Sequence, residues 1–150
     1  MSSSAQALLG PENEKKSPML YFPEGLPGLE PHRYFQVGRL PGNDYFLLLQ
    51  VVDSPELALI LVDPYPFYPH YRFQIEDTVK QELRGVTETE LLVFTTVTAG
   101  KDALYTNLAA PILISPSAGL GKQLILTEYR KMLRAPLEIR SARVGGERKG

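Results

Sequence analysis

The stretch "YFLLLQVVDSPELALILV", Tyr45–Val62, places two apolar runs on either side of a short polar turn. Apolar runs of this length between turn residues are typical of strands, and the "DSPE" at 53–56 favours a tight connection. We therefore predict an antiparallel hairpin. Both runs are apolar at consecutive positions, whereas a strand with one face in water alternates. We expect the second face to be covered as well, by a helix, by proline-containing loops or by another protein.

Further strand candidates flank this hairpin. They are rich in β-branched, aromatic and leucine residues and are bounded by turn residues, among them the "LPGND" turn at 40–44. The candidates span residues 19–22, 33–38, 90–99, 110–116 and 122–127. The 13 prolines and 12 glycines argue for many turns and few long helices. The sequence therefore predicts a mainly β fold of about seven strands.

One interior segment, "IEDTVKQELRG" at 75–85, is typical of a short helix. It has acidic residues at its start, Arg84 near its end and Gly85 in the position of a C-terminal cap. Val79 and Leu83 lie on one edge, which we expect to dock on the sheet. A second helical turn is expected around 127–133.

The segment "YFPEGLPGLEP", 21–31, combines three prolines with two glycines. Pro23 with Gly25, and Pro27 with Gly28, each follow turn chemistry, because proline presets φ and glycine accepts a positive φ. We expect two successive turns that fold back so that Leu26 and Leu29 pack on the body of the protein.

At 150 residues the chain has room for one domain with its own core. We predict that this domain spans residues 8–137. Residues 1–7 and 138–150 are small, polar, glycine-containing or basic, so both ends are expected to be flexible.

Charge and composition exclude several classes of protein. The formal net charge is -1, which lacks the basic excess of most nucleic-acid binders, although acidic residues dominate 53–90 and basic residues dominate from Arg130 onward. There is no cysteine, which excludes disulfides and thiolate sites. We find neither a signal peptide nor an apolar run of about 20 residues. We therefore expect a cytoplasmic protein without a membrane segment.

The sequence contains no recognisable catalytic motif. His32 and His70 have no second histidine or cysteine at metal-ligand spacing. The nucleophile elbow, the phosphate-binding loop and the dinucleotide fingerprint are absent, and "GLGK" at 119–122 is typical of a hairpin turn. We predict a protein that is not an enzyme and binds no cofactor or metal.

The best candidate for a binding site is "DPYPFYPHYRF", 63–73, where five aromatic residues lie among three prolines next to an acidic helix. Large, rigid aromatic side chains are typical anchors of protein interfaces. The alternative is a loop that packs its own rings into the core.

Four segments in order along the chain resemble the FliW family of bacterial flagellar assembly factors. They are "FPEGLPGLE" (22–30), "LLLQVVDSPELALILVDPY" (47–65), "NLAAPILIS" (107–115) and "GKQLIL" (121–126). With the predicted helix between them, they cover most of residues 9–129. The chain departs from the family at Leu29, where phenylalanine is usual, and in a less apolar first strand.

The resemblance implies a small, single-domain, β-barrel-like fold with a short peripheral helix. It also implies a non-enzymatic role: the family binds flagellin and the RNA-binding translational regulator CsrA, and exchange between these partners controls flagellin synthesis. No direct nucleic-acid or membrane contact is implied.

Clustering of charge and aromatic residues suggests which side chains face a partner. The aromatic residues would be anchors, and the acidic ones would attract a basic regulator. These predicted partner-facing residues are Asp63, Tyr65, Phe67, Tyr71, Glu76 and Asp77. A structural role is expected for Phe22, Pro23, Gly25, Pro27, Gly28, Asn107, Pro111 and Gln123, with the two amide side chains bonding main-chain groups near strand ends.

Two other functions stay open from the sequence. The arginine-rich residues at the C-terminal end would suit an RNA- or polyanion-binding β-barrel. The tyrosine-rich loop would suit a small-ligand or carbohydrate-binding module.

Overall fold

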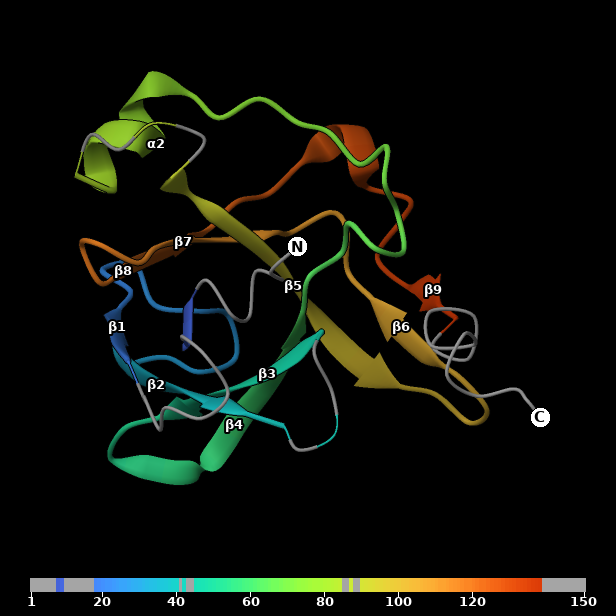
Figure 1. Cartoon of the computed structure of the whole chain (residues 1–150), viewed down its shortest axis with the longest axis horizontal. Helices are drawn as coiled ribbons and strands as arrows, with labels where there is room; N and C mark the ends of the chain where they lie inside the picture. The colour runs from blue at the N-terminus through green and yellow to red at the C-terminus, as the bar shows by residue number, and fades with distance from the viewer. Residues whose placement is uncertain are drawn as a thin grey trace.

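In the computed structural model, which describes residues 8–9, 18–40, 42, 45–84, 87 and 90–138, nine strands form one sheet. The nine strands and the helix labelled in Figure 1 are β1 (Met19–Tyr21), β2 (Tyr34–Arg39), β3 (Phe46–Val51), β4 (Ser54–Val62), α2 (Asp77–Glu82), β5 (Leu92–Ala99), β6 (Leu104–Thr106), β7 (Ile112–Ser115), β8 (Leu120–Gln123) and β9 (Ala135–Leu137). A 3-10 turn, η2 (Thr127–Tyr129), lies between β8 and β9.

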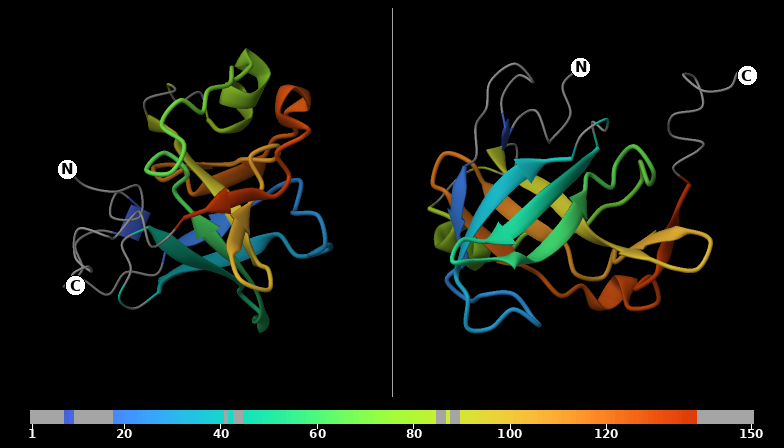
Figure 2. Two further views of the ribbon diagram at one scale, coloured as in Figure 1. Left: turned by 90° about the vertical axis from the view of Figure 1, so that its right-hand side faces the viewer. Right: turned by 90° about the horizontal axis from the view of Figure 1, so that it is seen from below.

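The sheet closes on itself into a ring. Its strand order is β4-β3-β2-β1-β8-β7-β5-β6-β9, and an additional pairing joins β4 to β5. All neighbours are antiparallel except β1 and β8, which meet in parallel at Tyr21 and Leu120. Strands β6 and β9 extend the far end of β5 beyond the ring (Figure 2). The predicted mainly β, barrel-like fold with a short peripheral helix is confirmed.

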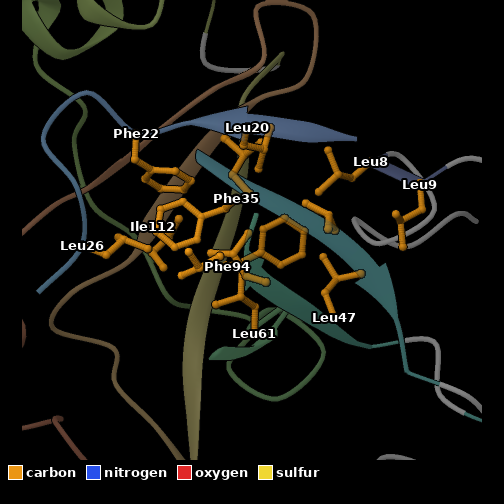
Figure 3. Close-up of a cluster of buried hydrophobic side chains, with 14 residues drawn as sticks. Leu8, Leu9, Leu20, Phe22, Leu26, Phe35, Leu47, Leu61, Phe94 and Ile112 are labelled. Carbon is orange, nitrogen blue, oxygen red and sulfur yellow. The ribbon is translucent and has the colours of Figure 1, made fainter. Parts of the chain in front are cut away.

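The 45–62 hairpin supplies much of the inner face of the ring. Leu47 and Leu49 on β3 and Leu61 on β4 are fully buried and pack in the main core with aromatic residues such as Phe35 and Phe94. Figure 3 shows these side chains pointing toward one another inside the ring. Closure pairs β4, which would otherwise be an edge strand, with β5.

The outer face of the hairpin is covered only in part. Phe46 and Val62 are buried beneath Leu137 and the loop that follows β4. By contrast, Leu57 and Ile60 on β4 each expose 37% of their surface. Within this chain, α2 and the proline-containing loops pack elsewhere and do not cover the middle of β4, so coverage there by another protein stays a prediction.

The loop at 21–31 folds back as predicted. Gly25 and Gly28 have φ of +69° and +85°, which is the region that favours glycine. The main-chain N–H groups of Gly25 and Leu29 donate to the carbonyl groups of Phe22 and Leu26. Leu26 is 2% exposed and lies in the main core, with Leu29 packed against it. The loop therefore closes one side of the ring.

Helix α2 is shorter than the predicted 75–85 segment. Glu76 is its N-cap and Leu83 its C-cap, and the residue with positive φ is Arg84, at 71°; the predicted cap Gly85 lies outside the described residues. Val79 and Leu83 pack on the outer side of the ring against Leu113 and Leu120, as expected from their spacing.

An ion-pair network also fixes α2 to the ring. The Lys122 ammonium on β8 lies 2.7 Å from a Glu24 carboxylate oxygen and 3.2 Å from one of Glu82. Burial alone would lower the pKa of Lys122, but its hydrogen bonds and charge interactions with the two glutamates outweigh that effect and raise the pKa.

Several boundaries differ from the prediction. Strand β8 covers 120–123 and not 122–127, while the expected helical turn near 127–133 is η2. Strands β6 and β9 were not predicted. The expected flexible ends at 1–7 and 138–150, apart from Glu138, lie outside the described residues. Within the described part of the chain, no helix has the length and apolar character needed to cross a membrane.

Candidate partner-binding surface

The segment from Asp63 to Glu76, here called the aromatic loop, leaves β4 and leads into α2. Asp63 is buried, and its carboxylate Oδ1 accepts a hydrogen bond of 3.1 Å from the main-chain N–H of Tyr65. The N–H groups of Phe67 and Tyr68 both donate to the Pro64 carbonyl. These bonds are typical of the turns that aspartate and proline initiate, so the start of the loop has a defined shape.

Tyr71 is the centre of the loop's packing. It is 3% exposed, and its ring lies 5.3 Å from that of Phe73 and 4.9 Å, edge to face, from that of Tyr129. Its hydroxyl donates a 2.6 Å hydrogen bond to the Leu108 carbonyl. Burial, followed by the nearby Tyr65, Tyr129 and Glu128, raises the pKa of the Tyr71 phenol well above its usual range. Tyr71 therefore holds the loop as a neutral hydrogen-bond donor.

Tyr129, in η2, connects the aromatic loop to the segment between β8 and β9. Its hydroxyl accepts a 3.1 Å bond from the Arg72 N–H and donates a 2.9 Å bond to the Arg72 carbonyl. A single side chain thus occupies both main-chain groups of one loop residue, as a paired strand would. The aromatic loop and η2 are consequently fixed to each other.

Phe67 packs in a different cluster. Its ring lies 5.7 Å from that of Tyr45, over the buried Val62 and Leu137. The neighbouring Tyr68 donates its hydroxyl to the Pro136 carbonyl on β9. Phe67 is half-buried, so one side of its ring is accessible while the other covers the outer face of the sheet.

The two predicted acidic residues at the start of α2 are exposed. The side chain of Asp77 is 93% exposed and lies 3.9 Å from the Lys80 ammonium, a separation at which a surface pair contributes little. Among the described residues, Glu76 has no ion-pair partner. Its carboxylate is therefore available to a partner.

A groove separates the end of the aromatic loop from the chain that follows β8. We call it the α2 groove; its volume is about 740 Å³. In Figure 1 the loop approaching α2 runs above the segment between β8 and η2. The residues that line the α2 groove are Arg72, Phe73, Gln74, Glu76, Val79, Leu124, Ile125, Leu126, Thr127 and Glu128.

Sequence reasoning missed the second wall of this groove. Residues 124–126 were predicted as part of a strand, with no functional role. Ile125 is 74% exposed, the largest exposure among the large hydrophobic residues that the structure describes. Only the position of this segment opposite the aromatic loop makes Ile125 notable, and sequence spacing carries no signal of that placement.

The structure separates the six predicted partner-facing residues. Tyr65 and Tyr71 lie together, with ring centroids 5.7 Å apart, and Asp63 bonds the main chain beneath them. Phe67 lies in another cluster, and only Glu76 of the six lines the α2 groove. Asp63 and Tyr71 are buried and present little surface, so the aromatic-rich loop is largely packed on itself.

Several residues expected to be structural occupy strand ends. The Asn107 Oδ1 accepts a 2.9 Å bond from the Ala109 N–H, and the Gln123 amide donates a 3.0 Å bond to the Ala110 carbonyl. Pro111 and Phe22 are buried, while Pro23 and Pro27 lie in the exposed turns of the 21–31 loop. These residues stabilise the closed ring of strands and do not form the exposed surface described above.

Two tyrosines of this surface are held in their neutral form. Burial, with a smaller contribution from Asp63 for Tyr65 and from Glu138 for Tyr68, raises the pKa of both phenols, so near neutral pH they are protonated and cannot act as bases. In the described ranges, no three histidine, cysteine or carboxylate side chains gather as a metal site would require.

Comparison with known proteins gives a consistent result. Residues 5–137 match the model of the family described as "FliW protein". The chain is 36% identical over 118 residues to a flagellar assembly factor FliW of Moorella thermoacetica, covering 75% of each chain. It is 32% identical over 129 residues to one of Caldanaerobacter subterraneus, covering 83% of this chain and 86% of the other. A crystal structure of a flagellar assembly factor FliW superposes with a TM-score of 0.69 at 28% identity, covering 79% of this chain and 83% of that one.

Proposed function

This chain belongs to the FliW family of flagellar assembly factors, and from that premise we propose that it controls flagellin synthesis by exchanging protein partners in the cytoplasm. In this proposal it binds flagellin, and it also binds a CsrA-type translational regulator and prevents it from repressing flagellin mRNA. It works without catalysis and without a cofactor. The observation that carries the proposal is the family match over residues 5–137.

Partner exchange needs only mass action. When flagellin accumulates it occupies the assembly factor, which leaves the regulator free to repress; when flagellin is exported, the factor returns to the regulator. The affinity of one partner must fall when the other is bound, and this coupling is reciprocal.

The charge distribution supports a basic regulator as one partner. A protein that binds RNA carries lysine and arginine to contact phosphates. Glu76 and Asp77 are exposed at the start of α2, and complementary charge speeds association and favours the correct partner. We propose Glu76 and Asp77 as contacts with the regulator.

The aromatic loop contributes in two ways in this proposal. Tyr65 and Phe67 are half-buried, and we propose that their accessible sides anchor a partner. Asp63 and Tyr71 support those anchors from beneath through their hydrogen bonds to Tyr65 and Leu108.

Titration calorimetry with each purified partner tests the proposal. We expect the flagellin and the regulator of the same organism each to bind, and the double variant Glu76→Gln with Asp77→Asn to weaken the regulator about tenfold at low salt. A matched control is Glu56→Gln with Asp53→Asn, which changes the same number of charges at two exposed positions, Asp53 in the β3–β4 turn and Glu56 near the start of β4.

The outcomes distinguish the alternatives. Binding of flagellin alone would reduce the role to a flagellin chaperone. Binding of neither protein would contradict the proposal and would direct attention to RNA and the basic residues after 138, which lie outside the described part of the chain.

A further inference from the structure

The aromatic loop ends in a segment, residues 73–75, whose main chain has no hydrogen-bond partner among the described residues. Residues 73–75 belong to no helix or strand. Phe73 and Ile75 pack toward the core while Gln74 is exposed, which is the alternation of a strand. None of the three makes a main-chain hydrogen bond to another residue that the structure describes.

On the opposite wall of the α2 groove, the main chain of Ile125 also lacks a hydrogen-bond partner among the described residues. The N–H groups of Leu124 and Leu126 donate to the carbonyls of Pro111 and Ala109. In an extended chain, successive residues direct their main-chain groups to opposite sides. The N–H and C=O of Ile125 therefore point away from residues 109–111, and they too have no partner among the described residues.

Unpaired main-chain groups on an extended segment are a template for another strand. Globular proteins normally pair or protect such edges. Here two of them line one groove. Peptides that add a strand to an exposed edge take their affinity from main-chain hydrogen bonds and their specificity from alternate side chains.

The side chains around the groove define which segment would fit. Val79, Leu124 and Leu126 give it apolar walls. Two acidic residues, Glu76 and Glu128, and one basic residue, Arg72, also line it, which leaves an acidic excess. Neither carboxylate has an ion-pair partner in the described part of the chain. A segment with apolar residues at alternate positions and a lysine or arginine beside them would satisfy both features.

We propose that the α2 groove binds an extended segment of a partner protein, in which apolar residues alternate with basic ones, and that this segment adds as a strand to Ile125, across the groove from residues 73–75. The proposal deepens the proposed function, on which it rests, by stating how one of the two partners is held. It assigns recognition to main-chain pairing, with Glu76 and Glu128 selecting basic side chains.

Hydrogen–deuterium exchange of the full chain, alone and with flagellin or the regulator, tests the proposal. The amide of Ile125 should become protected in one complex, because it then pairs with the added strand; protection of residues 73–75 alone would contradict this placement. Calorimetry should show that Ile125→Pro, which removes one N–H donor, weakens that partner by about tenfold. Ile125→Ala keeps the N–H and should lose less.

Leu133→Ala is the matched control, since Leu133 is 57% exposed and does not line the groove. Thermal unfolding shows whether each variant is folded. If Ile125→Pro does not fold, the double variant Glu76→Gln with Glu128→Gln replaces it, with an expected loss of about fivefold at low salt. A partner that binds every variant equally, or that protects other segments only, would overturn the proposal.

A test peptide of alternating valine and lysine distinguishes a failure of this proposal from a failure of the proposed function. If neither protein binds, the proposed function fails, but fluorescence polarisation of this labelled peptide still examines the groove. Binding that disappears when alternate peptide amides are N-methylated supports strand addition. Absence of binding, or equal binding of the methylated peptide, contradicts it. So does sedimentation showing that Ile125→Pro abolishes a homodimer, because a second copy would then be the occupant.

Discussion

Gly121 illustrates how one position on β8 depends on the residue opposite it. A Cβ atom added there would lie 2.3 Å from the Cζ of Phe22, a ring that is fully buried in the main core. Such a contact is far shorter than any relaxed packing distance, and a closely packed interior gives the ring little room to move. The predicted structural role of Phe22 thus depends on a glycine in a neighbouring strand.

The Gly121→Ala variant should lose about 1–3 kcal/mol of stability through overpacking. Urea denaturation followed by circular dichroism measures the loss. Gly38→Ala is the matched control, because a Cβ at Gly38 on β2 meets nothing within 4 Å. Equal stability of the two variants would contradict this, because it would mean that the Phe22 ring can move to make room for the added methyl group.

Removal of the Tyr71 hydroxyl should also destabilise the chain. Tyr71→Phe leaves the Leu108 carbonyl, now bonded at 2.6 Å, without that donor, and we expect a cost of about 1–3 kcal/mol. Tyr34→Phe, on a side chain that is 52% exposed, should change stability by less than about 0.5 kcal/mol. Denaturant midpoints of the two variants decide the comparison.

The same phenol makes stability depend on alkaline pH. The folded state raises the pKa of Tyr71 above the unfolded value of 10.0. The resulting stabilisation is complete below pH 10.0 and is lost as pH rises above it, since only the unfolded chain then releases the proton. Thermal melting from pH 8 to about 11 should fall more steeply for the unchanged chain than for Tyr71→Phe. Parallel curves would contradict this role.

The elements differ in how far the sequence predicts them. The Tyr45–Val62 hairpin and the 21–31 loop follow from local patterns, an apolar run on each side of a turn and glycines at positions of positive φ. Strands β6 and β9 do not, because each has three residues and β9 contains Pro136, a residue that local reasoning removes from strands. Their conformation depends on long-range pairing, since β6 pairs with β5 and β9 pairs with β6.

The candidate site follows the same division. The sequence identifies the aromatic loop as a cluster, but it cannot show that Tyr71 is covered by Tyr129, which lies far along the chain. Nor can it show that residues 124–126 face residues 73–76 across a groove. Both depend on ring closure, which is a long-range property of the sheet.

Docking of α2 depends mainly on its buried leucine. Leu83 is 1% exposed, so Leu83→Ala should cost about 2–5 kcal/mol. Lys122→Met should cost only about 1 kcal/mol, since Glu24 and Glu82 are largely exposed and can regain water. Chemical denaturation measures both losses. A larger loss for Lys122→Met would mean that the ion pairs, and not the apolar contact, hold α2.

At the scale of the whole molecule, the closed sheet is a rigid support for an outer surface. The ring buries one continuous core, and α2, the aromatic loop and η2 lie together on its outside (Figure 2). A rigid support lowers the entropy lost on binding. The FliW family membership supports our central proposal, that one small chain alternates between flagellin and a translational regulator.

The most direct measurement is a displacement titration. The complex of this chain with a fluorescently labelled regulator is titrated with flagellin, and anisotropy reports how much regulator is still bound. Our account predicts that flagellin lowers the affinity for the regulator and releases it, and that the released regulator again binds its RNA. Unchanged affinity in the presence of saturating flagellin, with both partners bound at once, would contradict the account.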